Sequence, residues 1–189
     1  MTSKTKAQRP AAPVTPSDAN LRFGIARADI TPPFPTTMGG YAARQDHFDR
    51  VNDPLSAEVL ILENNGARLV IVTADLITFE DEQAVDLRHQ IAEITKTSAE
   101  CVLLNASHTH GGPEMRDKAV YFRSSRDTSS SSRYRQWLQQ QLLDAVAQAA
   151  QNLAPGSLWL GCGKTAVNMN RRLERNGEIV NAPNPDGPV

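Results

Sequence analysis

The sequence of 189 residues contains only two cysteines, Cys101 and Cys162, which are far apart in the chain. This excludes a scaffold held by disulfides and the paired-cysteine spacing of a structural zinc site. An excess of charge of one sign is also absent, because 20 basic residues face 21 acidic ones and leave a net charge of −1. A duplex-binding surface usually shows as a basic excess, so we expect no nucleic-acid partner.

Long apolar runs are missing as well. None approaches the roughly 18–20 residues needed to cross a bilayer, and the longest, Leu69–Val72, has the length of a core strand. The basic start of the chain is not followed by the apolar stretch of about 7–15 residues that a secretory signal requires. We therefore expect a cytoplasmic protein. Residues 1–20 hold three prolines and no aromatic residue, so we expect them to form a disordered tail.

The remaining composition, 40% hydrophobic and 22% charged, is that of a globular domain with a real core. The expected elements, in chain order, are strands over 23–30, 57–63 and 67–74, a helix over 79–97, a strand over 100–105, a helix over 133–153, and strands over 157–160 and 165–169. This alternation favours an α/β fold, with a layered mixed β-sheet flanked by helices.

Local signals set these boundaries. Asn65-Gly66 supplies the positive φ angles of a tight hairpin turn. Thr78 with Asp81 three residues later predicts a capping box at the start of the first helix. The nearly continuous apolar run over 100–105 is typical of a strand buried on both faces. The serine-rich segment 124–132 is expected to be a surface loop.

The end of the chain resembles a loop rather than a closing element. Residues 181–189 read N-A-P-N-P-D-G-P-V, which is turn chemistry. We therefore expect an incomplete domain, in which residues 21–189 form the N-terminal part of a larger catalytic domain that continues past Val189.

The segment 105–115, N-A-S-H-T-H-G-G-P-E-M, carries the most chemistry. His108 and His110 come just after the expected buried strand, at the sheet edge where α/β folds collect ligand sites. Two residues apart in an extended chain, both imidazoles would project from one side and converge on one point. Neutral imidazole suits Zn²⁺, so we expect these two residues to be metal ligands.

Two ligands do not complete a catalytic zinc site, which usually takes three protein ligands and a water. The other candidates within this chain are Asp75, at the end of a strand, together with Asp46, His47 and Glu114. His89 falls among charged residues in a helix and is expected to be a surface histidine. On sequence alone, Arg171-Arg172 is interpreted as a surface pair that precedes a polar, hairpin-like stretch around Asn176-Gly177.

Five motifs, in order, resemble the N-terminal catalytic region of the neutral/alkaline ceramidase family: F-G-I-A-R-A-D-I-T-P-P, M-G-G-Y-A, L-V-I-V-T-A-D-L, N-A-S-H-T-H-G-G-P-E and N-M-N-R-R. These enzymes are zinc-dependent amidases that cleave the N-acyl bond of ceramide-type lipids. The resemblance implies that His108 is a zinc ligand with His110 as its companion. It also implies that Arg171 contacts the polar head or the reacting carbonyl of the substrate.

The resemblance places Gly39, Gly40 and Tyr41 in a loop near the mouth of the active site, and we assign Asp75 to substrate binding as well. Gly111 replaces a serine that the family usually has after its histidine pair. The family's remaining ligands, a second distant histidine, a glutamate and a tyrosine, would lie beyond Val189 together with the serine implicated in catalysis.

The expected function is therefore that of a zinc-dependent amide hydrolase acting on a sphingolipid-like or related lipid, with zinc as cofactor. Its expected partners are the lipid amide, a membrane surface in transient contact, and the C-terminal part of the same chain. Family relatives are often secreted, in contrast to the cytoplasmic location expected above. The alternative is a non-catalytic α/β binding module on the same fold without a complete metal site.

Overall fold

The structure is a computed structural model of the chain. It describes residues 20–41, 44, 47–116, 129–163, 165 and 167–188. They belong to two compact units that divide after Ser157. The segment expected to be a tail lies outside the described residues, apart from Asn20. None of the described helices is both long and apolar enough to cross a membrane.

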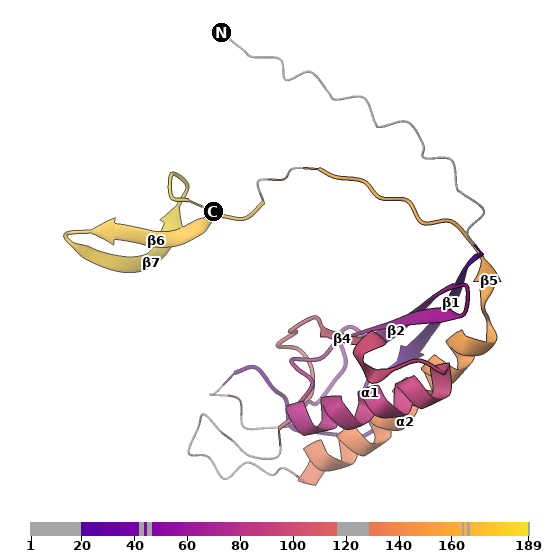
Figure 1. Cartoon of the computed structure of the whole chain (residues 1–189). Helices are drawn as coiled ribbons and strands as arrows, with labels where there is room; N and C mark the ends of the chain where they lie inside the picture. Colours follow the sequence, from indigo (N-terminus) through magenta and orange to yellow (C-terminus); the bar gives the residue numbers. More distant parts are fainter. Residues whose placement is uncertain are drawn as a thin grey trace. The chain divides into compact units, whose positions relative to one another are not determined.

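The first unit is built on a mixed sheet, which in the described part of the chain has five strands in the order β4-β3-β2-β1-β5 (Figure 1). The strands are β1 (Leu21–Asp29), β2 (Ser56–Asn64), β3 (Ala67–Ala74), β4 (Val102–Ala106) and β5 (Ala154–Pro155). Strands β3 and β4 are parallel, and all other neighbours are antiparallel. This confirms the predicted layered α/β fold with a mixed sheet.

The hairpin of β2 and β3 forms as its turn residues predict. Asn65 and Gly66 both have positive φ, 50° and 84°. This is the backbone conformation of the tight two-residue turns that match the twist of the two strands. The turn also fixes the register, with Asn64 opposite Ala67, so the alternate residues of both strands face the core together.

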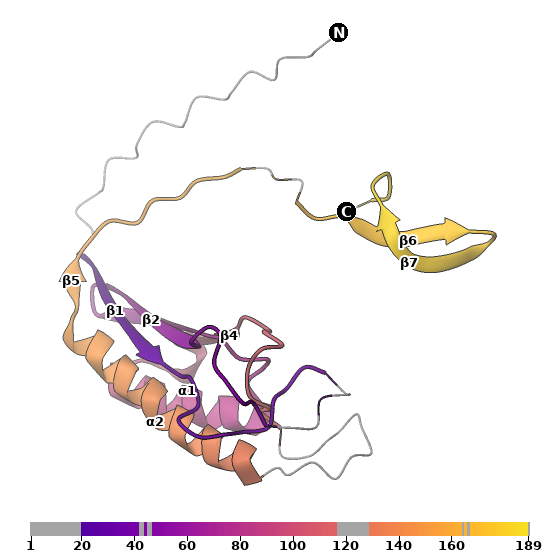
Figure 2. The same ribbon diagram turned by 180° about the vertical axis from the view of Figure 1, so that it is seen from behind.

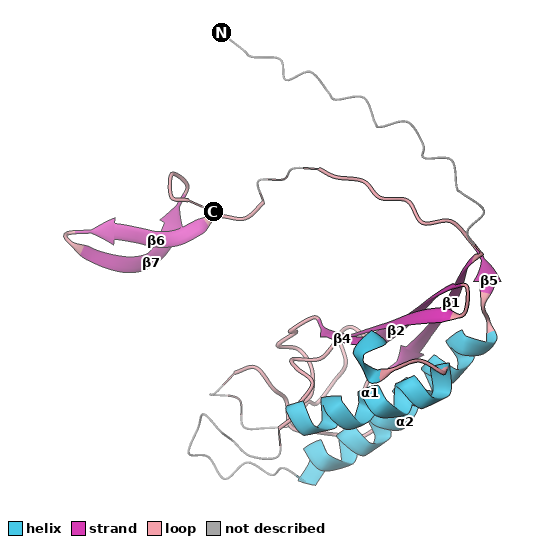
Figure 3. Ribbon diagram, in the orientation of Figure 1, coloured by secondary structure: helices cyan, strands magenta, loops and turns pink. Residues whose placement is uncertain are grey.

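Both helices cover the same face of the sheet, as seen from the two sides in Figure 1 and Figure 2 and by element type in Figure 3. They are α1 (Asp81–Thr95) and α2 (Ser129–Gln151), and a short 3₁₀ turn, η1 (Ala99–Cys101), leads into β4. Buried apolar side chains of the sheet and helices form one core between them, among them Val59, Ile61, Val70, Val72, Leu87, Ile91, Leu138, Leu142 and Val146. Tyr134 of α2 is fully buried and donates a hydrogen bond of 2.7 Å to the Ile30 carbonyl oxygen, which ties this helix to the end of β1.

Both predicted helix starts were wrong in detail. Helix α1 begins at Asp81 with Glu80 as its N-cap residue, and no side chain caps it. The Thr78 hydroxyl instead donates to the Phe79 carbonyl oxygen, so no capping box forms. Residues 129–132, expected in a loop, are the first turn of α2, and buried Ser131 lies one turn before buried Tyr134 on the face that packs on the sheet. Residues 124–128 lie outside the described residues.

The opposite face of the sheet carries a row of apolar side chains that are exposed or half-buried. Ile25, Leu60, Ile71 and Leu103 stand side by side across β1, β2, β3 and β4. Leu103 is 54% exposed, so the prediction that this strand is buried on both faces was wrong. The apolar run was interpreted correctly as a strand, but no described element of the first unit covers its second face.

The described part of the second unit forms a hairpin of β6 (Asn170–Arg175) and β7 (Glu178–Asn184). Its turn residues, Asn176 and Gly177, have φ of 53° and 83°. The strands predicted over 157–160 and 165–169 do not form in the described residues there, and residues 181–184 are strand rather than loop. The Asn-Gly turn explains the difference, because it aligns the residues on either side of it for pairing.

Neighbouring residues of β4 provide a test of the one-sided core. Val102 is 4% exposed and Leu103 is 54% exposed. We expect Val102→Thr to lower the free energy of unfolding by about 1–3 kcal/mol, because it buries a hydroxyl among apolar groups. The matched control, Leu103→Thr, should change it by less than about 0.5 kcal/mol. Urea unfolding of the 189-residue chain measures both, and equal losses would contradict the one-sided core.

Candidate metal and substrate site

The candidate site lies where β3 and β4 end. Ala74 and Ala106 are the last register partners of this parallel pair. The Ser107 amide continues the ladder by donating to the Ala74 carbonyl oxygen at 3.0 Å. Both strands therefore finish at one edge of the sheet, and the two following loops run side by side there. This is the edge at which α/β sheets bind ligands.

His108 is held in place by its backbone and by its ring. Its φ is +57°, a left-handed conformation that is uncommon for a residue other than glycine. Its Nδ1 lies 2.8 Å from the Ile77 carbonyl oxygen, in the loop after β3. Because a carbonyl oxygen only accepts, Nδ1 carries a proton, so in the neutral imidazole Nε2 is the nitrogen with the lone pair. This is the usual arrangement of a metal-binding histidine.

The imidazoles of His108 and His110 converge, as predicted. Their ring centroids are 5.2 Å apart with an angle of 69° between the planes. The predicted reason was wrong, because the segment is not extended. Left-handed His108 and a turn that begins at His110 bring the rings together instead.

Gly39, Gly40 and Tyr41 lie against His110. Gly40 has φ of +94°, and a Cβ on it would stand 2.6 Å from His110 Cγ, so only glycine fits. The Tyr41 ring meets the imidazole edge to face, with centroids 5.0 Å apart. The Gly39 amide donates to the Gly112 carbonyl oxygen at 3.0 Å. These contacts join the Gly-Gly-Tyr loop to the histidine loop.

Arg44 links the same two loops, and nothing in the sequence marked it for this role. Its Nη1 donates to the Gly39 carbonyl oxygen at 3.0 Å and to the His110 carbonyl oxygen at 2.9 Å. Its guanidinium carbon also lies 5.0 Å from the centroid of the Tyr41 ring. Loops that approach this closely expose backbone carbonyls that need a donor, and Arg44 supplies it.

The other candidate ligands have different partners. Glu114 is buried and forms two hydrogen bonds with the Arg116 guanidinium, at 2.8 and 2.9 Å. Burial raises the pKa of the Glu114 carboxyl, but the hydrogen bonds and charge of Arg116 hold it below its ordinary value. Asp75 Oδ2 accepts from the Ser56 amide and hydroxyl. The backbone of His47 pairs with that of Thr37 in an isolated antiparallel β-bridge.

No group of three His, Cys, Asp or Glu side chains is positioned to hold a metal ion within the described part of the chain. Asp46 lies outside it. His89 is exposed on α1, as predicted for a surface histidine. Arg171 lies in β6 of the second unit, so its role and that of Asp75 in substrate binding stay predictions.

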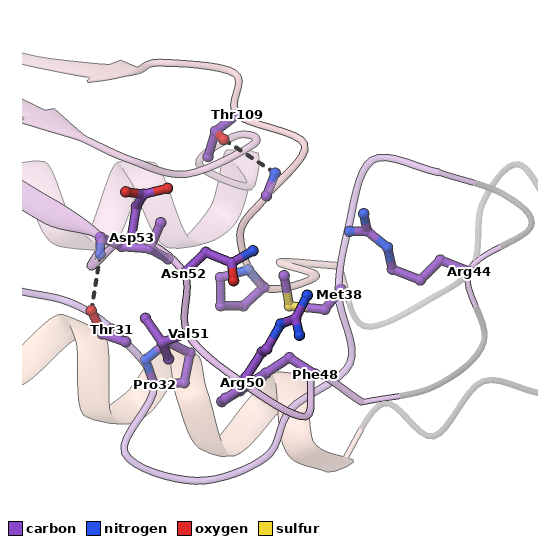
Figure 4. A pocket seen from close by; sticks show the side chains of 13 residues that line it. Thr31, Pro32, Met38, Arg44, Phe48, Arg50, Val51, Asn52, Asp53 and Thr109 are labelled. Atoms are coloured by element: carbon purple, nitrogen blue, oxygen red, sulfur yellow. Dashed lines mark hydrogen bonds between the residues drawn. The ribbon is translucent and has the colours of Figure 1, made fainter.

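A cavity of about 350 Å³ opens beside the histidine loop (Figure 4). Its walls come from the end of β1, the long loop before β2, and the loop after β4. The lining residues are Thr31, Pro32, Met38, Arg44, Phe48, Arg50, Val51, Asn52, Asp53, Leu55, Thr109, Gly111 and Pro113. Thr109 stands between the two histidines in sequence, so the cavity adjoins the candidate site.

Residues 21–175 match the sequence model of the N-terminal region of neutral/alkaline non-lysosomal ceramidases. The chain belongs to this family. Its fold is similar to that of the neutral ceramidase from Pseudomonas aeruginosa, with a TM-score of 0.52 and 22% identity over 74% of this chain. A second solved structure, a ceramidase complexed with C2, gives a TM-score of 0.54 and 23% identity over 74% of this chain. The chain spans only 23% and 22% of those two chains.

The contact between Gly40 and His110 can be tested against a glycine of the same backbone conformation. Gly66 also has positive φ, but a Cβ there would meet nothing within 4 Å. We expect Gly66→Ala to cost about 1–2 kcal/mol for the left-handed backbone alone. Gly40→Ala should cost more and should shift the imidazole NMR signals of His110. Unchanged His110 signals in Gly40→Ala would contradict the packing described.

The Glu114–Arg116 pair predicts a pH dependence. A carboxyl whose folded pKa is lowered contributes stability above its unfolded pKa of about 4.3 and loses it as the pH falls through the folded value. The 189-residue chain should therefore be more stable than Glu114→Gln at pH 7, and the two should converge in acid. Glu58→Gln, which removes a half-exposed carboxylate from a surface ion pair, is the control. A pH-independent difference in the free energy of unfolding would contradict this interpretation.

Proposed function

We propose that this chain forms the N-terminal part of a zinc-dependent amide hydrolase that cleaves an N-acyl bond of a sphingolipid-like or related lipid. Membership of the ceramidase family over residues 21–175 supports this proposal. The observation that carries it is the pair of converging imidazoles at the carboxyl edge of the sheet, one of which has a free Nε2. The proposal includes the metal (zinc), the bond that is cleaved (an amide) and the substrate (a lipid).

The two histidines fit part of a zinc shell. Two imidazoles on one tetrahedral ion, with Zn–N distances of about 2.0–2.1 Å, have ring centroids roughly 5 Å apart. The separation of 5.2 Å between His108 and His110 agrees with this value. When bound, zinc would polarise the amide carbonyl and lower the pKa of a coordinated water to about 7. His108 would bind through Nε2, since Ile77 occupies Nδ1.

The remaining ligands and catalytic groups would come from a region of the full-length protein beyond Val189. This chain spans only 22–23% of the solved ceramidases, so most of their length has no counterpart in these 189 residues. We therefore expect the 189 residues alone to be inactive.

Other residues of this chain would position the substrate. Arg171 would place its guanidinium donors on the carbonyl oxygen as negative charge develops there, an effect usually worth a few kcal/mol. The loop Gly39–Tyr41 would shape the entrance, because it packs against His110. Asp75 has one carboxylate oxygen bound to Ser56, so a substrate hydrogen bond would use the other. A lipid amide would bring the protein into transient contact with a membrane surface, and we place the activity in the cytoplasm.

A second candidate function is a binding module without catalysis. The absence of a third ligand near the histidines, within the residues described, favours it, as does Gly111 in place of the family serine. Metal analysis distinguishes the two functions.

The test compares three histidine variants of the full-length protein. His108→Ala should lose most of the zinc and the amidase activity together, because it removes a direct ligand. His110→Ala should lose zinc to the same degree if it is also a ligand. If its zinc affinity falls by only about 10–100-fold, His110 is instead a residue that hydrogen-bonds to a zinc ligand without binding the metal itself. His89→Ala, on the exposed face of α1, is the matched control and should keep both properties.

Zinc is measured by plasma mass spectrometry, and hydrolysis is measured by release of fatty acid from an N-acyl lipid. Stoichiometric zinc in His108→Ala with full activity would overturn the proposed metal site. A wild-type protein that binds no zinc and hydrolyses no amide would favour the binding module.

A further inference from the structure

The cavity beside the histidine loop is not used by the proposed function. None of the residues assigned above to metal binding, catalysis or substrate binding lines it. Its volume of about 350 Å³ lies within the range of small-molecule sites, roughly 300–1,000 Å³. Thr109 and Gly111, from the loop that carries both histidines, form part of its wall. A ligand held here would lie next to the candidate reaction centre.

Arg50, an exposed arginine of the cavity wall, has its guanidinium unpaired with respect to the described part of the chain. Arg50 forms no ion pair or hydrogen bond with any residue that the structure describes. Arg44, the other arginine of the cavity, donates to the carbonyl oxygens of Gly39 and His110. An arginine in such a position favours a carboxylate, which it binds with two parallel hydrogen bonds.

Figure 4 shows how the polar groups are distributed. The Arg50 guanidinium and the Asn52 amide point into the same space beside Met38. The Asp53 carboxylate lies at the other end of the cavity, near Thr109, and points away from Arg50. One end of the cavity is therefore positive and rich in hydrogen-bond donors, which suits an anionic group.

The rest of the lining is largely apolar. Its apolar side chains are Met38, Phe48, Val51 and Leu55, with Pro32 and Pro113, and they stand beside Thr31, Thr109 and Gly111. Val51 is 48% exposed, so a ligand that covered it would remove apolar surface from water. The positive end and the apolar wall together are complementary to an alkyl chain that carries a carboxylate.

We propose that this cavity binds an anionic amphiphile, with its carboxylate on Arg50 and Asn52 and its alkyl part on Met38, Phe48 and Val51. The inference rests on the proposed amidase function and narrows its substrate to N-acyl amines that carry a carboxylate, such as N-acyl amino acids. A free fatty acid also has a carboxylate and an alkyl chain. The experiment must therefore distinguish a free fatty acid from an N-acyl amino acid.

The experiment measures binding by calorimetry to the full-length protein in EDTA, below the micelle concentration of each probe. The probes are N-dodecanoylglycine, its neutral methyl ester, and dodecanoate. The acid should bind about 10–100-fold more tightly than the ester, as expected for hydrogen bonds to a charged group. Arg50→Gln should remove this preference and Arg50→Lys should restore part of it. The control, Arg27→Gln, affects only an exposed arginine paired with Glu58 and should leave the preference unchanged.

Equal affinity for acid and ester in the wild type, or a preference that survives Arg50→Gln, would overturn the carboxylate site. Dodecanoate binding as tightly as N-dodecanoylglycine would assign the cavity to a free fatty acid and overturn the narrowed substrate class. Because EDTA removes metal, these results do not depend on the zinc site. If metal analysis refutes the zinc site while the cavity still prefers the acid over the ester, the proposed function fails. The assignment of the cavity as a carboxylate site then stands.

Discussion

The parallel pairing of β3 with β4 is the constraint on which the candidate site depends. It ends both strands at one edge, and the Ser107 amide extends it by one hydrogen bond to Ala74. The loop after β3 is thereby brought close enough for the Ile77 carbonyl oxygen to accept a hydrogen bond from the His108 ring. Backbone pairing in the sheet thus determines which nitrogen of His108 is bound to the backbone and which is not.

A second set of contacts holds the other histidine. The Gly-Gly-Tyr loop packs against His110, and Arg44 bridges the two loops through their carbonyl oxygens. Neither loop belongs to a helix or a strand, so their mutual contacts replace the rigidity that regular structure would give. The same arrangement leaves the cavity with Arg50 open beside them.

Local patterns in the sequence predicted most of the fold. Asn65-Gly66 defined a hairpin because its turn needs positive φ at both residues, and the two histidines followed an apolar strand as expected. The prediction failed where short apolar runs were considered alone. Residues 157–160 form no strand. The polar hairpin-like stretch around Asn176-Gly177 does pair as predicted, because its turn rather than hydrophobicity aligns the strands. The open face behind Leu103 and the bridging role of Arg44 depend on tertiary contacts that no local pattern contains.

The short path from Val102 to His108 limits how members of this family can differ in length. Side chains of a strand alternate between faces, so one inserted residue in β4 would turn Val102 or the residues after it to the wrong side of the sheet. Two inserted residues would keep the faces but carry the histidine about 6–7 Å past the Ile77 carbonyl oxygen. We therefore expect insertions and deletions among relatives to fall outside this interval, which would make it a fixed point for aligning their sequences.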